Sequence, residues 1–179
     1  GSGVLGSAIQ MDKDVTKRLL QAAGIPVVPW VTVRKHELSA IEAAVERVIR
    51  AIGLPCFVKP ANTGSSVGIS KVKTRAELAP ALLEAARYDE KLLVEQAIDA
   101  REVEVAVLGN ERPEASVPGE IVPHKEWYDY EAKYIDESTE LIVPAKVPEA
   151  VAAELQRIAT QAFLVLEGAG LARVDFFLE

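Results

Sequence analysis

Residues 102–107 alternate strictly between valine and other side chains, and this pattern restricts the fold more than any other. Valines occupy positions 103, 105 and 107, while Glu102, Glu104 and Ala106 occupy the positions between them. Because successive side chains of a strand point to opposite faces, the segment predicts a strand that is buried on one face only. Gly109 and Asn110 then predict a turn that leads into a hairpin.

The remaining helix and strand patterns come in a mixed order. Residues 1–7 are expected to form a loop. Helices are expected over residues 11–23 and 148–167 and after the capping boxes 39–42 and 74–77, and strands over residues 56–59, 69–72, 92–95, 141–143 and 171–178. This order lacks the regular alternation of a doubly wound parallel sheet. We therefore predict an α+β fold in two small lobes, residues 1–100 with a preceding linker helix and residues 101–179.

Charge and cysteine content narrow the class of protein. The 179 residues carry a formal net charge of −7, which works against non-specific nucleic-acid binding because such binding needs a basic surface. No apolar run approaches the roughly 20 residues that a membrane helix needs, and no signal-peptide pattern is present. The single cysteine, Cys56, cannot form an internal disulfide. We expect a cytoplasmic protein without a nucleic-acid or membrane partner.

A loop rich in glycine and serine follows Lys59 at the end of a predicted strand. It contains Gly64, Ser65, Ser66 and Gly68. Glycines let backbone N–H groups approach a phosphate closely, serine hydroxyls add donors, and the lysine adds a positive charge. No Gly-Lys-Ser/Thr ends the loop, so it is not a Walker A loop. The alternative interpretation is a flexible hairpin loop with a surface lysine.

Two further segments suit the same kind of ligand. Lys13 opens a predicted helix, where the helix dipole favours acidic residues, and an anion shared with Lys59 would account for both lysines. A solvated lysine is the alternative. The strand 92–95 ends in a carboxylate and continues to Ile98, which suits an adenine bound through the backbone and a ribose bound through a carboxylate. An ordinary strand end is the alternative.

Residues 126–134 contain four aromatic and several charged side chains. Loops that close over a binding site often have this composition, although a surface loop with its aromatic rings tucked into a groove is also possible.

In the last predicted strand, alternation puts Arg173 and Asp175 on one face. Charges in so apolar a strand need a partner or a metal to offset desolvation. Asp175 could bind Mg²⁺ and Arg173 an oxygen of substrate or phosphate, or the two could pair structurally.

Seven short motifs follow one another along the chain. They are Gly-Ser-Gly-Val-Leu-Gly-Ser-Ala, Met-Asp-Lys, Lys-Pro-x₃-Gly-Ser-Ser-Val-Gly, Val-Glu-Gln, Glu-Val-Glu-Val-Ala-Val-Leu-Gly, Tyr-Asp-Tyr-Glu-Ala-Lys-Tyr and Ala-Arg-Val-Asp-Phe. In this order they resemble the D-alanine–D-alanine ligase family of ATP-grasp enzymes. The resemblance implies an ATP-grasp fold with the nucleotide between the two lobes. It also implies an ATP-dependent ligation of two D-alanines through an acyl phosphate, for peptidoglycan precursor synthesis.

The resemblance implies a role for each motif residue. Lys13 and Lys59 are expected on the ATP phosphates, under a loop formed by Ser65, Ser66, Val67 and Gly68. Glu95, Gln96, Ala97 and Ile98 are expected beside the adenine, and Glu102 on the ribose. Lys133 is expected on the γ-phosphate, Tyr134 beside the second substrate, Arg173 on the tetrahedral intermediate and Asp175 on Mg²⁺ or Mn²⁺. Ser65, Lys133, Tyr134 and Arg173 form the expected catalytic set, and ATP and the metal are the expected cofactors.

Departures from the family pattern carry their own expectations. The family's N-terminal domain, through which its members are commonly homodimeric, and its Glu-x-Asn magnesium motif lie outside residues 1–179. The piece alone is therefore expected to have little or no ligase activity. Gln96 and Ala97 replace the Lys-Trp of some relatives, which alters the adenine contact. The motif 128–134 favours D-alanine over D-lactate as nucleophile. Another ATP-grasp carboxylate–amine ligase and a non-catalytic ATP-binding fragment remain the alternatives.

Overall fold

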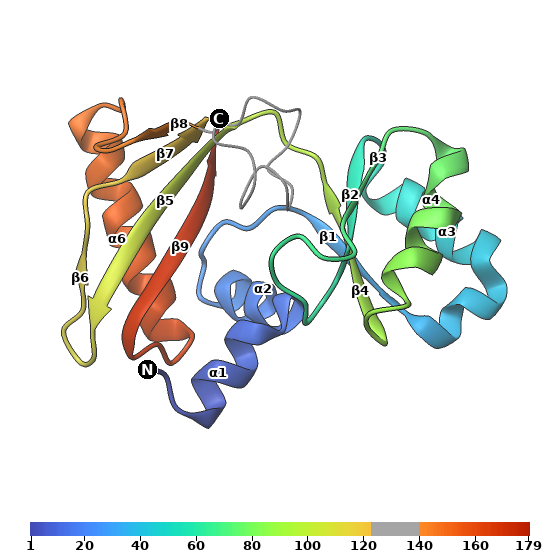
Figure 1. The fold of residues 1–179 in the computed structure, drawn as a ribbon, viewed down its shortest axis with the longest axis horizontal. Helices are drawn as coiled ribbons and strands as arrows, with labels where there is room; N and C mark the ends of the chain where they lie inside the picture. Colours follow the sequence, from blue (N-terminus) through green and yellow to red (C-terminus); the bar gives the residue numbers. More distant parts are fainter. Residues whose placement is uncertain (123–139) are drawn as a thin grey trace. The chain divides into compact units, whose positions relative to one another are not determined.

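The computed structural model describes residues 1–122 and 140–179 (Figure 1). The chain forms two compact units. The five-strand unit consists of Gly1–Gln10, Val15–Pro26 and Asp99–Glu179, and the four-strand unit of Met11–Asp14 and Val27–Ile98. All strand pairs described are antiparallel and helices accompany both sheets, so the predicted α+β class is confirmed. The division of the chain at residues 100 and 101 stays a prediction.

The four-strand unit has its strands in the order β1-β4-β2-β3. They are β1 (Trp30–Arg34), β2 (Cys56–Pro60), β3 (Ser70–Val72) and β4 (Lys91–Gln96). A 3-10 helix, η1 (Lys35–Ala40), and the helices α3 (Ile41–Ala51) and α4 (Arg75–Ala85) complete the unit. The capping box of Thr74 and Glu77 opens α4 as predicted.

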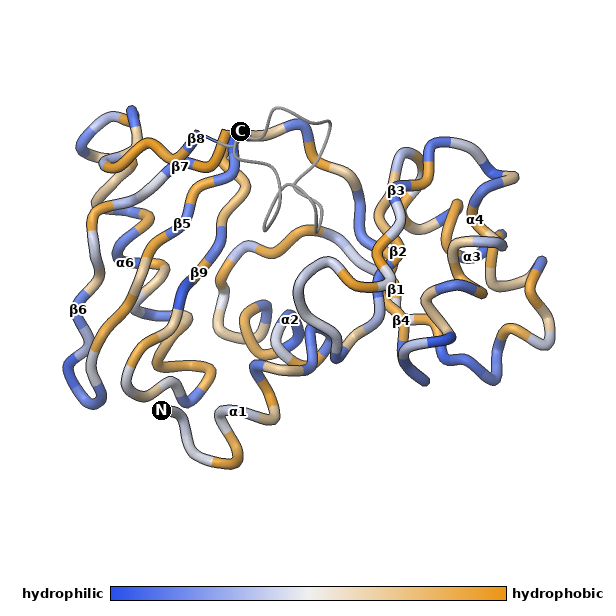
Figure 2. Tube along the Cα trace, in the orientation of Figure 1, coloured by the Kyte–Doolittle hydropathy of each residue, from blue (hydrophilic) through white to orange (hydrophobic). Residues whose placement is uncertain are grey.

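The core of the four-strand unit lies between α3, α4 and one face of the sheet. Val58 of β2 and Val94 of β4 pack there with Val48 of α3 and Leu82 of α4, all fully buried. The middle of β4 is hydrophobic, as its colour in Figure 2 shows. Because strand side chains alternate, the opposite face of the sheet carries the polar residues of β2 and β4. The candidate site lies on that polar face.

The five-strand unit is built around the long strand β5 (Arg101–Gly109). Its other elements are most of α1 (Val4–Met11) and of α2 (Lys13–Ala22), together with β6 (Glu114–Ala115), β7 (Gly119–Val122), β8 (Glu140–Ile142), α6 (Glu149–Val165) and β9 (Gly170–Leu178). The last residue of α1 and the first two residues of α2 belong to the four-strand unit. β5 pairs with β9 over its whole length, and with β6 in the predicted hairpin. Leu155, Ala159 and Phe163 of α6 pack on the valine face of β5, so the predicted one-sided burial of β5 is confirmed.

Several local predictions were wrong. Residues 4–7 belong to α1 rather than to a loop. Gly6 allows this helix to lie close to Glu167, since a Cβ at Gly6 would lie 2.3 Å from the carbonyl oxygen of Glu167. Ser39 does not cap α3, since its hydroxyl donates to the carbonyl of His36 within η1. The strands β1 and β7 were not predicted. β7 has no clear alternating pattern, whereas Val31 and Val33 of β1 do alternate with Thr32 and Arg34. Within the residues described, no helix has the length and hydrophobicity needed to span a membrane.

Candidate functional site

Lys13 lies against the start of the glycine- and serine-rich loop in the four-strand unit. The backbone N–H of Lys13 donates to the carbonyl oxygen of Ala61 at 3.1 Å. Its ammonium group donates to the carbonyl oxygens of Ala61, also at 3.1 Å, and of Thr63. The first residue of α2 thus places a positive charge at the root of the predicted phosphate loop, and Lys13 is not simply a solvated side chain.

Lys13 and Lys59 influence each other electrostatically. Burial lowers the pKa of Lys13, and the positive charge of Lys59 lowers it further, while Glu95, Asp89 and Asp12 act in the opposite direction without cancelling the effect. Two lysines that repel each other on a partly buried face form a site that favours an anion, because an anion would offset both charges. This arrangement supports the predicted sharing of one anion by the two lysines.

The loop after β2 has an unusual backbone. Ser65 and Ser66 have φ angles of 50° and 59°, in the left-handed region that residues other than glycine seldom adopt. Such residues cost about 1–3 kcal/mol each and persist only where the surroundings hold them. Internal hydrogen bonds support the loop, from the N–H of Val67 to the carbonyl of Gly64 at 3.0 Å and from the hydroxyl of Thr63 to the carbonyl of Val67 at 3.1 Å.

Lys59 and Glu95 form an ion pair on the polar face of the sheet. Lys59 Nζ donates to Glu95 Oε2, and the two side chains are 19% and 8% exposed. Lys59 is therefore not the surface lysine of the alternative interpretation. Glu95 lies near the end of β4, the strand between β1 and β2, opposite Trp30 and Phe57. Its carboxylate is directed at Lys59, one of the two predicted phosphate ligands.

Two backbone N–H groups in the segment after Glu95 already form hydrogen bonds within the protein. The N–H of Gln96 donates to the carbonyl of Pro29, and the N–H of Ala97 donates to the carbonyl of Pro55, both at 3.1 Å. An adenine contact at these two residues would therefore have to use their carbonyl oxygens. Gln96 is exposed, whereas Ala97 and Ile98 are half-buried.

A buried charge cluster that the sequence did not reveal lies beside Lys13. Asp14 is 3% exposed and accepts hydrogen bonds from Trp30 Nε1 at 3.0 Å and from Thr32 Oγ1 at 2.8 Å. Lys91, which is 7% exposed, forms an ion pair with Asp12 and lies 3.6 Å from Asp14 Oδ2. The cluster fixes the first turn of α2 to the strands β1 and β4. The only sequence signal was an acidic residue in the first helical turn.

The five-strand unit holds the second group of predicted residues. Arg173 and Asp175 share the face of β9 away from α6, as predicted, and pair through two hydrogen bonds of 2.7 and 3.0 Å. Glu104 lies directly opposite Asp175 in the register, and its Oε2 is 3.2 Å from Arg173 Nε. Glu102 is half-buried on the same face of β5. Arg173 and Asp175 therefore do pair with each other, and their placement beside Glu104 also suits a charged ligand.

A divalent metal fits this face on the chemistry of its donors. Glu104 Oε2 is buried and accepts no hydrogen bond, and the carboxylate of Asp175 lies across from it on β9. Magnesium is usually held by one or two carboxylates together with substrate phosphates and water. Among the described residues, no group of three or more potential metal ligands comes together. Glu104 and Asp175 would supply the carboxylates that such a metal takes from the protein.

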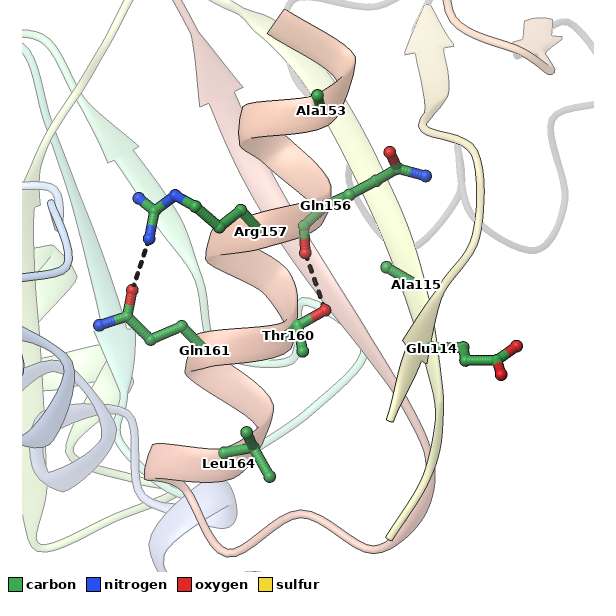
Figure 3. A pocket seen from close by; sticks show the side chains of 8 residues that line it. All are labelled: Glu114, Ala115, Ala153, Gln156, Arg157, Thr160, Gln161 and Leu164. Atoms are coloured by element: carbon green, nitrogen blue, oxygen red, sulfur yellow. Dashed lines mark hydrogen bonds between the residues drawn. The ribbon is translucent and has the colours of Figure 1, made fainter. Parts of the chain in front are cut away.

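A shallow hollow of about 780 Å³ on the five-strand unit is not part of this site. It lies between α6 and β6, as Figure 3 shows, and Glu114, Ala115, Ala153, Gln156, Arg157, Thr160, Gln161 and Leu164 line it. Several of its polar groups are already paired: Arg157 donates to Gln161 at 3.1 Å, and Thr160 donates to the carbonyl of Gln156 at 2.9 Å. None of the predicted site residues lines it. Lys133 and Tyr134 lie outside the described residues.

Comparison with known proteins gives a consistent picture. The family described as D-ala D-ala ligase C-terminus matches residues 19–179. The D-alanine--D-alanine ligase of Geobacillus thermodenitrificans is 52% identical over 179 residues, which are 99% of this chain and 49% of that protein. The D-alanine--D-alanine ligase A of Chromobacterium violaceum is 54% identical over 99% of this chain and 48% of its own length.

Solved structures agree with these sequence matches. The D-alanine-D-alanine ligase from Coxiella burnetii superimposes with a TM-score of 0.83 at 40% identity, over 98% of this chain and 45% of that chain. The VanG D-Ala:D-Ser ligase from Enterococcus faecalis superimposes with a TM-score of 0.87 at 34% identity, over 98% of this chain and 50% of that chain. The chain thus spans about half the length of the relatives that it matches.

Proposed function

The chain belongs to the D-alanine–D-alanine ligase family, and we propose that it supplies the ATP-binding region of an enzyme that joins two D-alanines. The family resemblance and the ATP-grasp fold predicted from the sequence are both confirmed by this membership. The proposed substrates are ATP and D-alanine, and the proposed role is peptidoglycan precursor synthesis in the cytoplasm. Homodimerisation through the family's N-terminal domain stays a prediction.

The proposed reaction has two steps. A carboxylate oxygen of the first D-alanine attacks the γ-phosphorus of ATP, which gives an acyl phosphate and ADP. The amine of the second D-alanine then attacks the acyl carbon, and phosphate leaves as the peptide bond forms and the amine loses its proton. Phosphoryl transfer depends mainly on positioning and on charge neutralisation, so lysines, backbone donors and arginine are the side chains and groups that it needs.

One observation carries the proposal: the ammonium group of Lys13 lies at the start of the loop of residues 60–68, where burial and then the positive charge of Lys59 lower the pKa of Lys13. A triphosphate would offset both charges and accept hydrogen bonds from the backbone and hydroxyl groups of Ser65, Ser66 and the N–H groups up to Gly68. Glu95, Gln96, Ala97 and Ile98 would lie beside the adenine, and Glu102 would bind the ribose hydroxyls.

Arg173 and Asp175 serve the chemical step in this proposal. Arg173 would stabilise the oxyanion of the tetrahedral intermediate, because its guanidinium is a permanent positive charge with several donors. Asp175, with Glu104 opposite it, would hold Mg²⁺ or Mn²⁺, which supplies neutralisation of phosphate charge when bound. Lys133 would contact the γ-phosphate, and Tyr134 would lie beside the second D-alanine. Ser65 would belong to the catalytic set as well as to the phosphate loop.

Calorimetry of Mg·ATP binding tests the phosphate site on the 179-residue chain. Lys59→Ala should weaken ATP binding at least tenfold, since hydrogen bonds to charged groups contribute about 1.5–3 kcal/mol each. Lys35→Ala is the matched control, because Lys35 is an exposed lysine that pairs with Glu90. Equal affinities of the wild type and Lys59→Ala would contradict the phosphate role of Lys59.

Product analysis tests the ligase assignment. A protein that spans the full family length and contains this chain should form D-alanyl-D-alanine from ATP and D-alanine, whereas the 179-residue chain should form little or none. D-serine and D-lactate, offered in competition, should be poorer nucleophiles than D-alanine. A product with a different acid or amine would favour another ATP-grasp carboxylate–amine ligase, and normal ligation by the chain alone would contradict the expected inactivity of the fragment.

A further inference from the structure

The turn between α4 and β4 holds the first residues of the phosphate loop. Asp89 Oδ2 accepts hydrogen bonds from the backbone N–H of Asn62 at 2.8 Å and from the side-chain amide of Asn62 at 2.9 Å. The other oxygen, Oδ1, accepts from the N–H of Lys91 at 3.1 Å. One carboxylate therefore ties Asn62, which opens the loop, to the start of β4. The N–H of Ala61 also donates to the carbonyl of Lys91 at 2.9 Å.

The same turn contacts the far end of the loop. Gly68 has a φ of +71°, and a Cβ built on it would lie 2.7 Å from Cδ2 of Tyr88 and 2.9 Å from Cγ of Pro60. The ring of Tyr88 thus rests directly on the backbone of Gly68, with no room for a side chain between them. Residues 88–91 consequently contact both ends of the segment 62–68, one end through Asp89 and the other through Tyr88.

Asp89 is well suited to hold the loop as an anion. Partial burial acts to raise the pKa of Asp89, but the hydrogen bonds from the N–H of Lys91 and from both donors of Asn62 outweigh burial and hold the pKa below its ordinary value. Hydrogen bonds that involve a charged partner are roughly twice as strong as neutral ones. The strained conformation of Ser65 and Ser66 needs such support, because neither φ angle is intrinsically favourable.

We propose that Asp89 is a positioning residue for the phosphate loop, which acts through Asn62 to hold residues 62–68 in a conformation ready for the ATP phosphates. The proposal rests on the proposed function, because that function makes the loop a phosphate-binding segment. Asp89 itself is not expected to touch ATP. Its removal should therefore impair binding of phosphate groups and spare binding of the nucleoside.

The first test compares ligands on the 179-residue chain by calorimetry. Asp89→Ala should weaken binding of Mg·ATP and Mg·ADP about tenfold, the effect expected for the loss of charge-assisted hydrogen bonds, and should leave adenosine binding unchanged. Asp89→Asn should show an intermediate loss, since its amide oxygen can still accept from Asn62 while its uncharged NH2 group cannot accept from the N–H of Lys91. Glu90→Ala is the matched control, because Glu90 is exposed and pairs with Lys35 outside the loop. Equal loss for adenosine and ATP would overturn the proposal.

Amide hydrogen exchange provides a second test that needs no ligand. Asp89→Ala should speed exchange at residues 62–68 at least tenfold relative to both the wild type and Glu90→Ala, while exchange in β4 beyond Lys91, whose N–H donates to Asp89, stays as in the wild type. Unchanged exchange in the loop would overturn the positioning role whatever the affinities. If the wild type fails to bind ATP but the loop loosens in Asp89→Ala, the positioning contact stands and the proposed function of the loop is the part that fails.

Discussion

Lys59 of β2 and Glu95 of β4 form an ion pair across neighbouring strands, on the face of the sheet that α3 and α4 leave uncovered. Phe57 is the direct register partner of Glu95, so Lys59 reaches Glu95 from the next position on the same face. Both residues belong to the predicted nucleotide site. Their pairing gives the site a built-in counter-charge, which keeps a lysine ammonium in place on a largely buried surface.

Breaking this pair should destabilise the chain more than deleting both charges. Lys59→Met leaves the buried carboxylate of Glu95 without its partner and should lower the free energy of unfolding by about 2–3 kcal/mol. The double variant Lys59→Met, Glu95→Gln should lose less than the sum of the two single variants. Urea unfolding of all four proteins measures this coupling, and additive losses would show that the pair contributes nothing.

Asp14 should be among the polar residues most important for stability. Asp14→Ala removes the acceptor for Trp30 Nε1 and Thr32 Oγ1 and leaves Lys91 with Asp12 alone. The expected loss is about 2–4 kcal/mol, because two buried donors lose their acceptor and a buried ammonium loses one of its two carboxylates. Asp14→Asn should lose less, since it still accepts a hydrogen bond. In thermal unfolding the Tm of Asp14→Ala should lie below that of Asp14→Asn, and the Tm of Asp14→Asn below that of the wild type. Any other order would speak against the stabilising role of the cluster.

Gly68 should tolerate alanine poorly, whereas Gly64 in the same loop should tolerate it well. A methyl group at Gly68 would meet Tyr88 and Pro60 below 3.0 Å at a positive φ, while a methyl group at Gly64 meets nothing within 4 Å. Gly68→Ala should lower stability by about 1–3 kcal/mol and weaken ATP binding. Gly64→Ala should change stability by less than about 0.5 kcal/mol. Denaturant titration of both variants measures their free energies of unfolding. Equal losses of stability in Gly68→Ala and Gly64→Ala would contradict the contact between Gly68 and Tyr88.

Cys56 should make stability fall at alkaline pH. Burial raises the pKa of Cys56 from an ordinary value of 9.0 to about 11. Between these values the thiol of the unfolded chain ionises while the folded chain keeps it neutral, so the free energy of unfolding decreases as pH rises. The contribution should approach 1.4 kcal/mol per pH unit, roughly the limit for one proton. The free energy of unfolding, measured for the wild type and Cys56→Ala between pH 8 and 11, isolates the contribution of Cys56. Parallel pH dependences of the two proteins would refute the prediction.

Long periodic segments were the predictable part of the fold. The alternation in β5 buries the valines that the sequence indicated, because tertiary packing follows the same periodicity. The short strand β7 was not predicted, since its four residues show no clear pattern and its pairing with β5 and β8 makes it a strand. Gly6 was wrongly predicted to lie in a loop. A glycine in a loop and a glycine at a close contact within a helix cannot be told apart from the sequence.

The residues of the candidate site also fall into two groups, those predicted from the sequence and those that only the structure shows. Lys13, Lys59 and the loop of residues 64–68 were predicted as candidates from residue types alone, because phosphate binding needs few kinds of group. Asp14, Lys91 and Asp89 were not, since each acts through partners far away in sequence. Asp89 meets Asn62 across 27 positions, and only the folded chain shows that contact.

The placement of Asp12 and Asp14 has a consequence for chimaeric proteins. These carboxylates belong with the sheet of residues 27–98, although residues 15–26 of the intervening chain belong to the other unit. A gene fragment that encodes only residues 27–98 would leave Lys91 buried without either counter-ion. A crossover between two relatives anywhere from residue 15 to residue 26 would combine the carboxylates of one parent with the lysine, tryptophan and threonine of the other. Recombinants that exchange residues 11–14 together with residues 27–98 should therefore fold more often than those that split the two segments.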